Sequence, residues 1–521
     1  MKGKRRYTLS ASVVLSSMVF GSWVTGVEAQ SQNPETPPAL NSSPGGPAGG
    51  SENVPPGVIP QPNIDSPGVV AGVTLGELYV DNLTIAARDK PKQTSWITEI
   101  QPFIKSAYRG PRFSGLLDYT LTGYLYKGQS RHNQLAQNLD AHGTLVILPQ
   151  HFFLDGSALY GREVVNQQLP TGSGTFFLDN NRANVAIGLL SPYWLQDLGN
   201  VGSLTLRYTR GRVVYNHRGI SAENRTVVNG IPDVTSNAVQ FSLVSPTYQT
   251  WGWNLEYSEQ RLNPDFGQSV QFAVAKLGAS LLVNNNIRLL ADAGKENRFL
   301  PDGTVQQLGA PFWDAGFEWS ITRNKFRLLA GHRFFGRSFQ LSWTHQAALL
   351  TTDLSYVEQP TDYNQQLLGL SSGTGVAPPT NIHAAIPSLT ERQPYLSKRM
   401  SASATYTMPS STLSVRVYDE SRSYFAQNSS EERVANADVS WLFNVGAFTT
   451  LTPGFRWQRY KFRDGQISHM YYEQLAIVHQ FNPRNFGSLR LRHDSSNVSS
   501  GSPGAHGYRV NVIFLQWTHL F

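Results

Sequence analysis

The sequence predicts an all-β fold, a transmembrane antiparallel β-barrel of about 22 strands, within a range of roughly 18–24. Three observations predict it. Apolar and polar residues alternate with period two over segments of about 8–12 residues from Val73 onward. Tight turns alternate with long polar loops along the chain. Only 15% of the residues are charged and 11% are aromatic, whereas an ordinary soluble domain has about 25% charged residues.

The alternating segments define individual strands. In Ser203–Arg210, Leu204 and Leu206 share one face while Arg207 lies on the other. The first strand is expected at about Val73–Leu83 and the last at Tyr508–Phe521. Segments with a similar alternation are Asn237–Val244, Trp251–Gln260, Phe312–Ile321, Phe326–Arg333, Phe339–Thr344, Leu413–Tyr418, Ala435–Phe443 and Gly487–Arg492.

A soluble β-sandwich would also alternate, so the connections decide between the two folds. Short turns are expected at Arg109–Arg112, Asn284–Asn286, Arg323–Lys325, Pro409–Ser411 and Asn482–Asn485. Long polar loops are expected at Asn166–Asn181, His217–Val234, Asn297–Gly309, Gln359–Gln393 and Asp494–His506. Short turns on one rim and long loops on the other are typical of outer-membrane barrels.

Three regions follow each other along the chain. Residues 1–29 predict a signal peptide, with a basic start, an apolar run from Leu9 to Phe20 and a small-residue cleavage site before Gln30. Residues 30–72 hold 10 prolines and 7 glycines, a composition that predicts a disordered periplasmic tether. Residues 73–521 form the predicted barrel. The sequence therefore predicts location in the cell outer membrane.

The last strand carries a candidate assembly signal. Ile513, Leu515, Trp517 and the terminal Phe521 share one face of Gly507–Phe521. A closing amphipathic strand that ends in phenylalanine resembles the signal by which bacterial outer-membrane proteins are inserted. The expected partners are therefore the barrel assembly machinery, outer-membrane lipid and lipopolysaccharide.

The composition argues against several other functions. The chain has no cysteine, and its net charge of +7 is spread without a Lys/Arg-rich run, so we expect no nucleic-acid partner. The pattern G-x-S-x-G at Gly369–Gly373 lies in a predicted loop rather than the strand–turn–helix that a serine hydrolase requires. We expect no catalytic residues, no metal and no cofactor, and a protein that is not an enzyme.

Arginines recur on the inward face of several predicted strands. Their apolar neighbours fix this face, because alternate side chains point to opposite sides of a strand. One interpretation is charge pairing with inward acids such as Glu256, Asp292, Asp314, Glu318 and Asp438. The other is a basic lining of the lumen that favours anions. The arginines are Arg207, Arg288, Arg327, Arg416, Arg456, Arg490 and Arg492.

About half of the chain resembles the outer-membrane barrel family associated with the PEP-CTERM/exosortase system. The most specific matches are Leu117–Gly143 (LDYTLTGYLYKGQSRHNQLAQNLDAHG) and Gly331–His345 (GHRFFGRSFQLSWTH). Shorter matches are LYVDNLTIA, TEIQPFIKS, FFLDGSALY, LSPYWLQDLG and RYTRGRVVY. The resemblance implies an outer-membrane protein linked to exopolysaccharide synthesis and protein sorting. It implies no catalytic residues.

Three functions remain open on the sequence alone. The barrel is expected to be a pore or an export and assembly component, with an anionic polysaccharide among the possible solutes. A plugged transporter is a second reading, although 43 tether residues are too few to form a plug. The alternative is a non-conducting structural or docking barrel. The loop Gln359–Gln393 folds into the barrel as a constriction or stays at the surface.

Overall fold

The computed structural model describes residues 67–178, 181–216, 231–246, 250–301, 303–368, 393–425, 431–499 and 505–521. The predicted signal peptide and most of the predicted tether lie outside these residues. The G-x-S-x-G pattern at Gly369–Gly373 also lies outside them.

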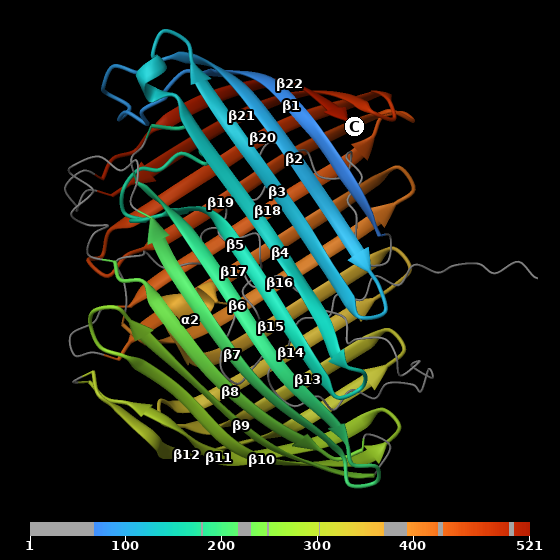
Figure 1. Ribbon diagram of the computed structural model, residues 1–521. Coiled ribbons are helices and arrows are strands. Elements are labelled where there is room, and N and C mark those ends of the chain that lie inside the picture. The colour runs from blue at the N-terminus through green and yellow to red at the C-terminus, as the bar shows by residue number, and fades with distance from the viewer. Residues whose placement is uncertain are drawn as a thin grey trace, which may run out of the picture.

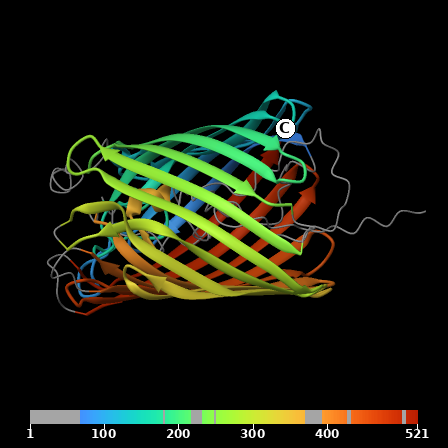
Figure 2. The same cartoon turned by 90° about the horizontal axis from the view of Figure 1, so that it is seen from below.

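The described chain forms one closed antiparallel sheet of 22 strands, which confirms the predicted fold. Figures 1 and 2 show the strands tilted around a barrel. Two short helices accompany them, η1 (Ser130–His132) and α2 (Tyr363–Leu367). The strands are β1 Gly68–Val80, β2 Ser95–Arg109, β3 Phe113–Tyr126, β4 Gln134–Leu148, β5 Phe152–Val164, β6 Arg182–Asp197, β7 Ser203–Asn216, β8 Val234–Val244, β9 Trp251–Pro264, β10 Val270–Asn284, β11 Ile287–Phe299, β12 Val305–Ile321, β13 Asn324–Arg333, β14 Gly336–Gln346, β15 Leu350–Thr361, β16 Tyr395–Met408, β17 Ser411–Tyr424, β18 Glu432–Asn444, β19 Thr449–Lys461, β20 Ile467–Asn482, β21 Asn485–Val498 and β22 Arg509–Leu520.

The first and last strands close the barrel. β1 pairs with β22 from Gly72 opposite Leu520 to Val80 opposite Val512. β1 starts at Gly68 rather than at Val73, because β2 is long enough to pair with it as far as Ala107 opposite Gly68. Closure leaves the sheet without an unpaired edge, as a membrane barrel requires.

Turns and loops separate to opposite rims. The five short turns expected from the sequence all join strands on the rim that holds Gly68 and Phe521. Outer-membrane barrels place such turns in the periplasm, so the other rim is extracellular. The expectation of long loops at Asn297–Gly309 and Asp494–His506 is wrong in part. β11 runs to Phe299 and β21 to Val498, because polar residues such as Asn297 and Asp494 face the lumen and only look like loop residues.

The outer surface of the barrel is apolar. In β22, Ile513, Leu515 and Trp517 are 43%, 62% and 43% exposed, and the terminal Phe521 is 76% exposed. The inward residues between them, such as Phe514 and Gln516, are buried. The four residues of the candidate assembly signal therefore lie on the lipid-facing side. No helix in the described parts of the chain is long and apolar enough to cross a membrane.

The two largest buried apolar clusters of the described residues lie inside the barrel, in its extracellular half. One buried apolar cluster joins the wall β5–β11 to α2, and includes Val185, Val213 and Leu367. A second joins the wall β22–β1–β2–β3 to the β5–β6 loop, and includes Leu78 and Phe176. Loops that fold inward thus supply part of both clusters.

Candidate functional site

The loop after β15 turns into the lumen. α2 follows directly, and Asp362 caps it by accepting a hydrogen bond from the backbone N–H of Gln365 at 2.6 Å. Tyr363, Leu367 and Leu368 are almost completely buried. Figure 1 shows α2 inside the barrel, between the front and back walls. The expected loop Gln359–Gln393 begins later than predicted, because β15 runs to Thr361; residues 362–368 fold inward as a constriction, and residues 369–392 lie outside the described chain.

α2 contacts a distant part of the wall. The amide Nε2 of Gln365 donates to Oε1 of Gln260 on β9 at 2.9 Å, and the hydroxyl of Tyr215 on β7 donates to Oδ1 of Asn364 at 3.0 Å. Gly211 on β7 permits the close approach, because a Cβ there would lie 3.0 Å from Cδ2 of Leu368. These contacts span the lumen from β15 to β7–β9.

Burial changes the protonation of the α2 cap. It raises the pKa of the Asp362 carboxyl to about 7, although the hydrogen bond from the Gln365 backbone works in the opposite direction. Burial also raises the pKa of the neighbouring Tyr363 hydroxyl well above its usual value. Burial therefore favours the protonated form of the cap.

The β5–β6 loop forms a second inward element. The ring of Phe176 packs on Phe177 and on Phe514 of β22, with centroids 4.4 and 5.7 Å apart. The hydroxyl of Tyr508 donates to the carbonyl oxygen of Thr171 at 2.8 Å, and the hydroxyl of Ser173 donates to the Asp494 carboxylate. The loop leaves β5 and docks on the wall where the barrel closes.

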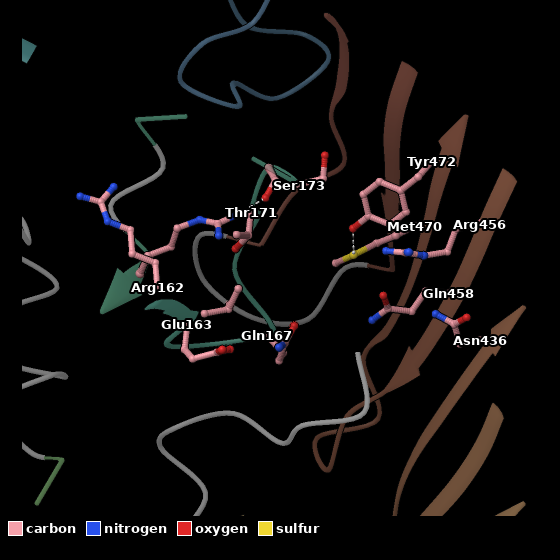
Figure 3. Close-up of a pocket in the computed structure, with 13 residues that line it drawn as sticks. Arg162, Glu163, Gln167, Thr171, Ser173, Asn436, Arg456, Gln458, Met470 and Tyr472 are labelled. Carbon is pink, nitrogen blue, oxygen red and sulfur yellow. Dashed lines mark hydrogen bonds between the residues drawn. The ribbon is translucent and has the colours of Figure 1, made fainter. Parts of the chain in front are cut away.

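A cavity separates this loop from the wall β18–β20. Figure 3 shows Asn436, Arg456, Gln458, Met470 and Tyr472 on one side of it, and loop and β5 residues on the other. The empty space is about 710 Å³, part of which is open to solvent. Its lining combines guanidinium, amide, hydroxyl and phenol groups, which suit a polar ligand. The other residues that line it are Arg162, Glu163, Val164, Gln167, Thr171, Gly172, Ser173 and Arg182.

Cross-strand register arranges the wall of the cavity. Asn436 lies directly opposite Gln458, and Arg456 lies directly opposite Tyr472. Nε of Arg456 donates to Oδ2 of Asp438 at 3.1 Å. Asn436 is 2% exposed, and its Oδ1 has no hydrogen-bond partner among the described residues. A buried amide oxygen of this kind is an unused acceptor at the cavity surface.

A buried ionic network supports the neighbouring wall. Glu420 accepts hydrogen bonds from Nε and Nη2 of Arg422 at 3.0 and 2.8 Å and from Nη2 of Arg399 at 3.3 Å. The hydroxyl of Tyr418 donates to the same carboxylate at 2.6 Å. Glu420 and Arg422 are both fully buried. One carboxylate thus holds two guanidinium groups inside the barrel.

Three of the predicted inward arginines pair with acids. Nη1 of Arg207 lies 2.7 Å from Oδ2 of Asp155. Arg456 pairs with Asp438 at 3.1 Å, and Nε of Arg492 lies 3.4 Å from Oδ1 of Asp494. Of these acids, the sequence analysis named only Asp438.

The other four predicted arginines also lie on inward positions. Glu318 is the direct cross-strand neighbour of both Arg288 and Arg327. Arg416 lies directly opposite Asp438, and the guanidinium carbon of Arg490 lies 5.2 Å from the ring centre of Phe514. Acids therefore lie directly beside Arg288, Arg327 and Arg416, so the lining is not a bare basic ring.

Three further acids named as partners pair with different cations. Glu256 pairs with Lys276 at 2.9 Å, Asp314 with Arg333 at 3.4 Å and Glu318 with Lys325 at 3.8 Å. The described residues contain no group of three or more His, Asp or Glu side chains that could hold a metal ion.

The sequence analysis missed α2 and the aromatic tip of the β5–β6 loop. A signal for both was present in the strands. Val185, Ile187 and Val213 occupy inward positions at the extracellular ends of β6 and β7. Apolar residues on both faces of a strand indicate that something covers the inner face.

No protein-family model and no curated protein matches the chain. Among solved structures, the FrpB iron transporter of Neisseria meningitidis (F3-3 variant) is similar, with 12% identity, a TM-score of 0.45 and coverage of 87% of this chain and 81% of that one. The siderophore receptor PirA of Pseudomonas aeruginosa has 8% identity and a TM-score of 0.41, with coverage of 89% and 81%. Similarities at this level carry no conclusion about function.

Proposed function

We propose that this outer-membrane barrel is a gated channel for hydrophilic solutes, in which α2 and the β5–β6 loop form the gate. The docking of α2 across the lumen is the observation that carries the proposal. The gate is attached through loops rather than built as a separate domain. It occupies the extracellular half, while the periplasmic half keeps polar and charged side chains on the wall, including Arg288 and Arg327.

The solute we propose is an anionic saccharide, in line with the exopolysaccharide and PEP-CTERM link that the family resemblance implies. The cavity beside the β5–β6 loop supports this choice. Arg456 offers a guanidinium group for a carboxylate, Asn436 and Gln458 offer amides for hydroxyl groups, and Tyr472 offers an aromatic ring. These groups match a sugar acid better than an apolar ligand.

A non-conducting structural barrel is the second candidate. The complete burial of Leu367 and Phe176 favours it, since a tightly docked loop resists opening. The two candidates differ in one property: only the channel requires that α2 leave the wall.

Reversible cross-linking of α2 distinguishes them. The chain contains no cysteine, so Gln260→Cys and Gln365→Cys can be linked by a short, reducible bifunctional thiol reagent without background reaction. In planar bilayers the linked protein should lose conductance, and reduction should restore it. Gln365→Cys alone, treated identically, is the control. Conductance that is unchanged by the cross-link would refute the gate. A wild type that never conducts would favour the structural barrel.

A further inference from the structure

Three cations gather on the outer surface of the barrel, near its extracellular rim. Arg433 on β18 and Lys461 on β19 lie directly opposite each other. Arg459 lies two residues before Lys461 and therefore on the same face. This is the lipid-facing side, because Phe455 on the same face of β19 is 42% exposed. We call these three residues the basic rim patch.

The charge of the basic rim patch is only partly balanced. Nε and Nη2 of Arg433 donate to the carboxylate of Asp419 at 3.0 and 2.8 Å. Neither Arg459 nor Lys461 has an ion pair among the described residues. Glu431 lines the same hollow, but its carboxylate accepts a hydrogen bond from Ser421. Like charges placed directly opposite each other destabilise a strand pair, so the patch suits an external anion.

The depth of the patch identifies which anions reach it. Trp457 lies on the same face of β19, two residues nearer the membrane than Arg459. Tryptophan marks the boundary between hydrocarbon and headgroups. Lys461 lies four residues beyond Trp457. At about 3.4 Å per residue and a tilt of about 40°, it stands roughly 10 Å above that boundary. The patch is therefore at the level of the lipid headgroups in the outer leaflet.

We propose that the basic rim patch binds the phosphate groups of lipopolysaccharide. The outer leaflet of the outer membrane presents this lipid, whose glucosamine phosphates lie at the headgroup level. Guanidinium groups bind phosphate through paired hydrogen bonds, and an ammonium adds a mobile charge. The hollow lined by Glu431, Arg433, Ala435, Arg459 and Lys461 holds about 520 Å³ of empty space, part of it open to solvent, which a phosphate group can enter. This site is independent of the gate and of conduction.

Lipid binding to the purified, refolded full chain tests the proposal. Native mass spectrometry in detergent would compare diphosphoryl lipid A with its dephosphorylated form and with phosphatidylglycerol. Arg459→Gln/Lys461→Gln should weaken diphosphoryl lipid A binding by roughly 10- to 30-fold. Lys461 is exposed and Arg459 is half-buried on the outward face of β19, so their replacement leaves the interior of the barrel unchanged, and unchanged heat-modifiable mobility would verify folding.

A matched control separates the patch from general charge. Arg323→Gln/Arg484→Gln removes the same charge from two exposed periplasmic turns and should leave lipid A binding unchanged. An equal loss of lipid A binding in the control would overturn the proposal that the basic rim patch is the binding site. Equal affinity of the wild type for dephosphorylated lipid A would show that acyl chains alone bind. Equal affinity for phosphatidylglycerol would show that the patch binds any phosphate headgroup, and so overturn the assignment to lipopolysaccharide.

Discussion

Weakening the contact between α2 and the wall is the most direct test of the gate. We consider Leu367→Ala/Leu368→Ala. Both side chains are fully buried in the cluster that joins α2 to β5–β11. Neither belongs to a strand, so the double change loosens the loop without touching the hydrogen bonds of the barrel.

The magnitude follows from the burial. A buried Leu→Ala change costs about 2–5 kcal/mol, since apolar contacts are lost and a cavity remains. Two such changes at the lower limit of this range reduce the free energy of docking of α2 by about 4 kcal/mol. Every 1.4 kcal/mol shifts an equilibrium about tenfold, so the ratio of undocked to docked α2 should rise roughly 500- to 1,000-fold.

Single-channel recording in planar bilayers measures this shift as open probability. Leu329→Ala is the matched control, because Leu329 is a buried inward residue of β13 outside the α2 cluster. The double variant should open far more often than the wild type, and the control should resemble the wild type. An open probability that stays the same in all three proteins would refute the view that α2 closes the lumen.

Four further predictions concern the wall, the lumen, the cap and the last residue. Glu420→Gln leaves two buried guanidinium groups without their carboxylate and should lower the free energy of unfolding in urea by about 3–5 kcal/mol; a loss below 1 kcal/mol would contradict the buried network. Glu318→Gln removes the acid between two arginines and should shift reversal potentials in a salt gradient towards anions, whereas a shift towards cations would argue against the predicted basic lining. Burial raises the pKa of Asp362 from 3.8 to about 7. Protonation of Asp362 therefore stabilises the docked state of α2 at acid pH, and this stabilisation is lost as the pH rises through 7. Open probability should therefore increase between pH 5 and pH 8, and Asp362→Asn should flatten this profile; a wild type insensitive to pH would disprove the linkage. Deletion of Phe521 should reduce outer-membrane insertion without affecting export, so unchanged heat-modifiable mobility and surface labelling would exclude an assembly role.

The sequence could predict the wall of the barrel because strand geometry acts on each residue locally. Alternation in Trp251–Gln260 predicts a strand, and β9 runs from Trp251 to Pro264. The same rule failed at Asn297 and Asp494, where consecutive polar residues looked like loops. Strands that extend beyond the membrane contact water on both faces. Their extracellular ends therefore lose the alternation on which the prediction depends.

Charge partners were harder to predict, because they depend on register between strands. The sequence placed Arg456 on the inward face and named Asp438 as an inward acid. It could not show that these two residues lie directly opposite each other. Arg207 pairs with Asp155 although β6 lies between their strands. Such contacts need the curvature of the closed sheet as well as the register.

The inward loops depend on still longer-range information, since each docks on a wall that it does not extend. α2 leaves β15 and packs on β5–β11, and the β5–β6 loop packs on β22–β3. Val165 at the start of the β5–β6 loop belongs to the α2 cluster, while Phe176 near its end belongs to the other. One loop therefore links both buried clusters. If α2 moves as proposed, it leaves the cluster to which Val165 belongs, so the β5–β6 loop offers a route between the two inward elements in addition to the wall.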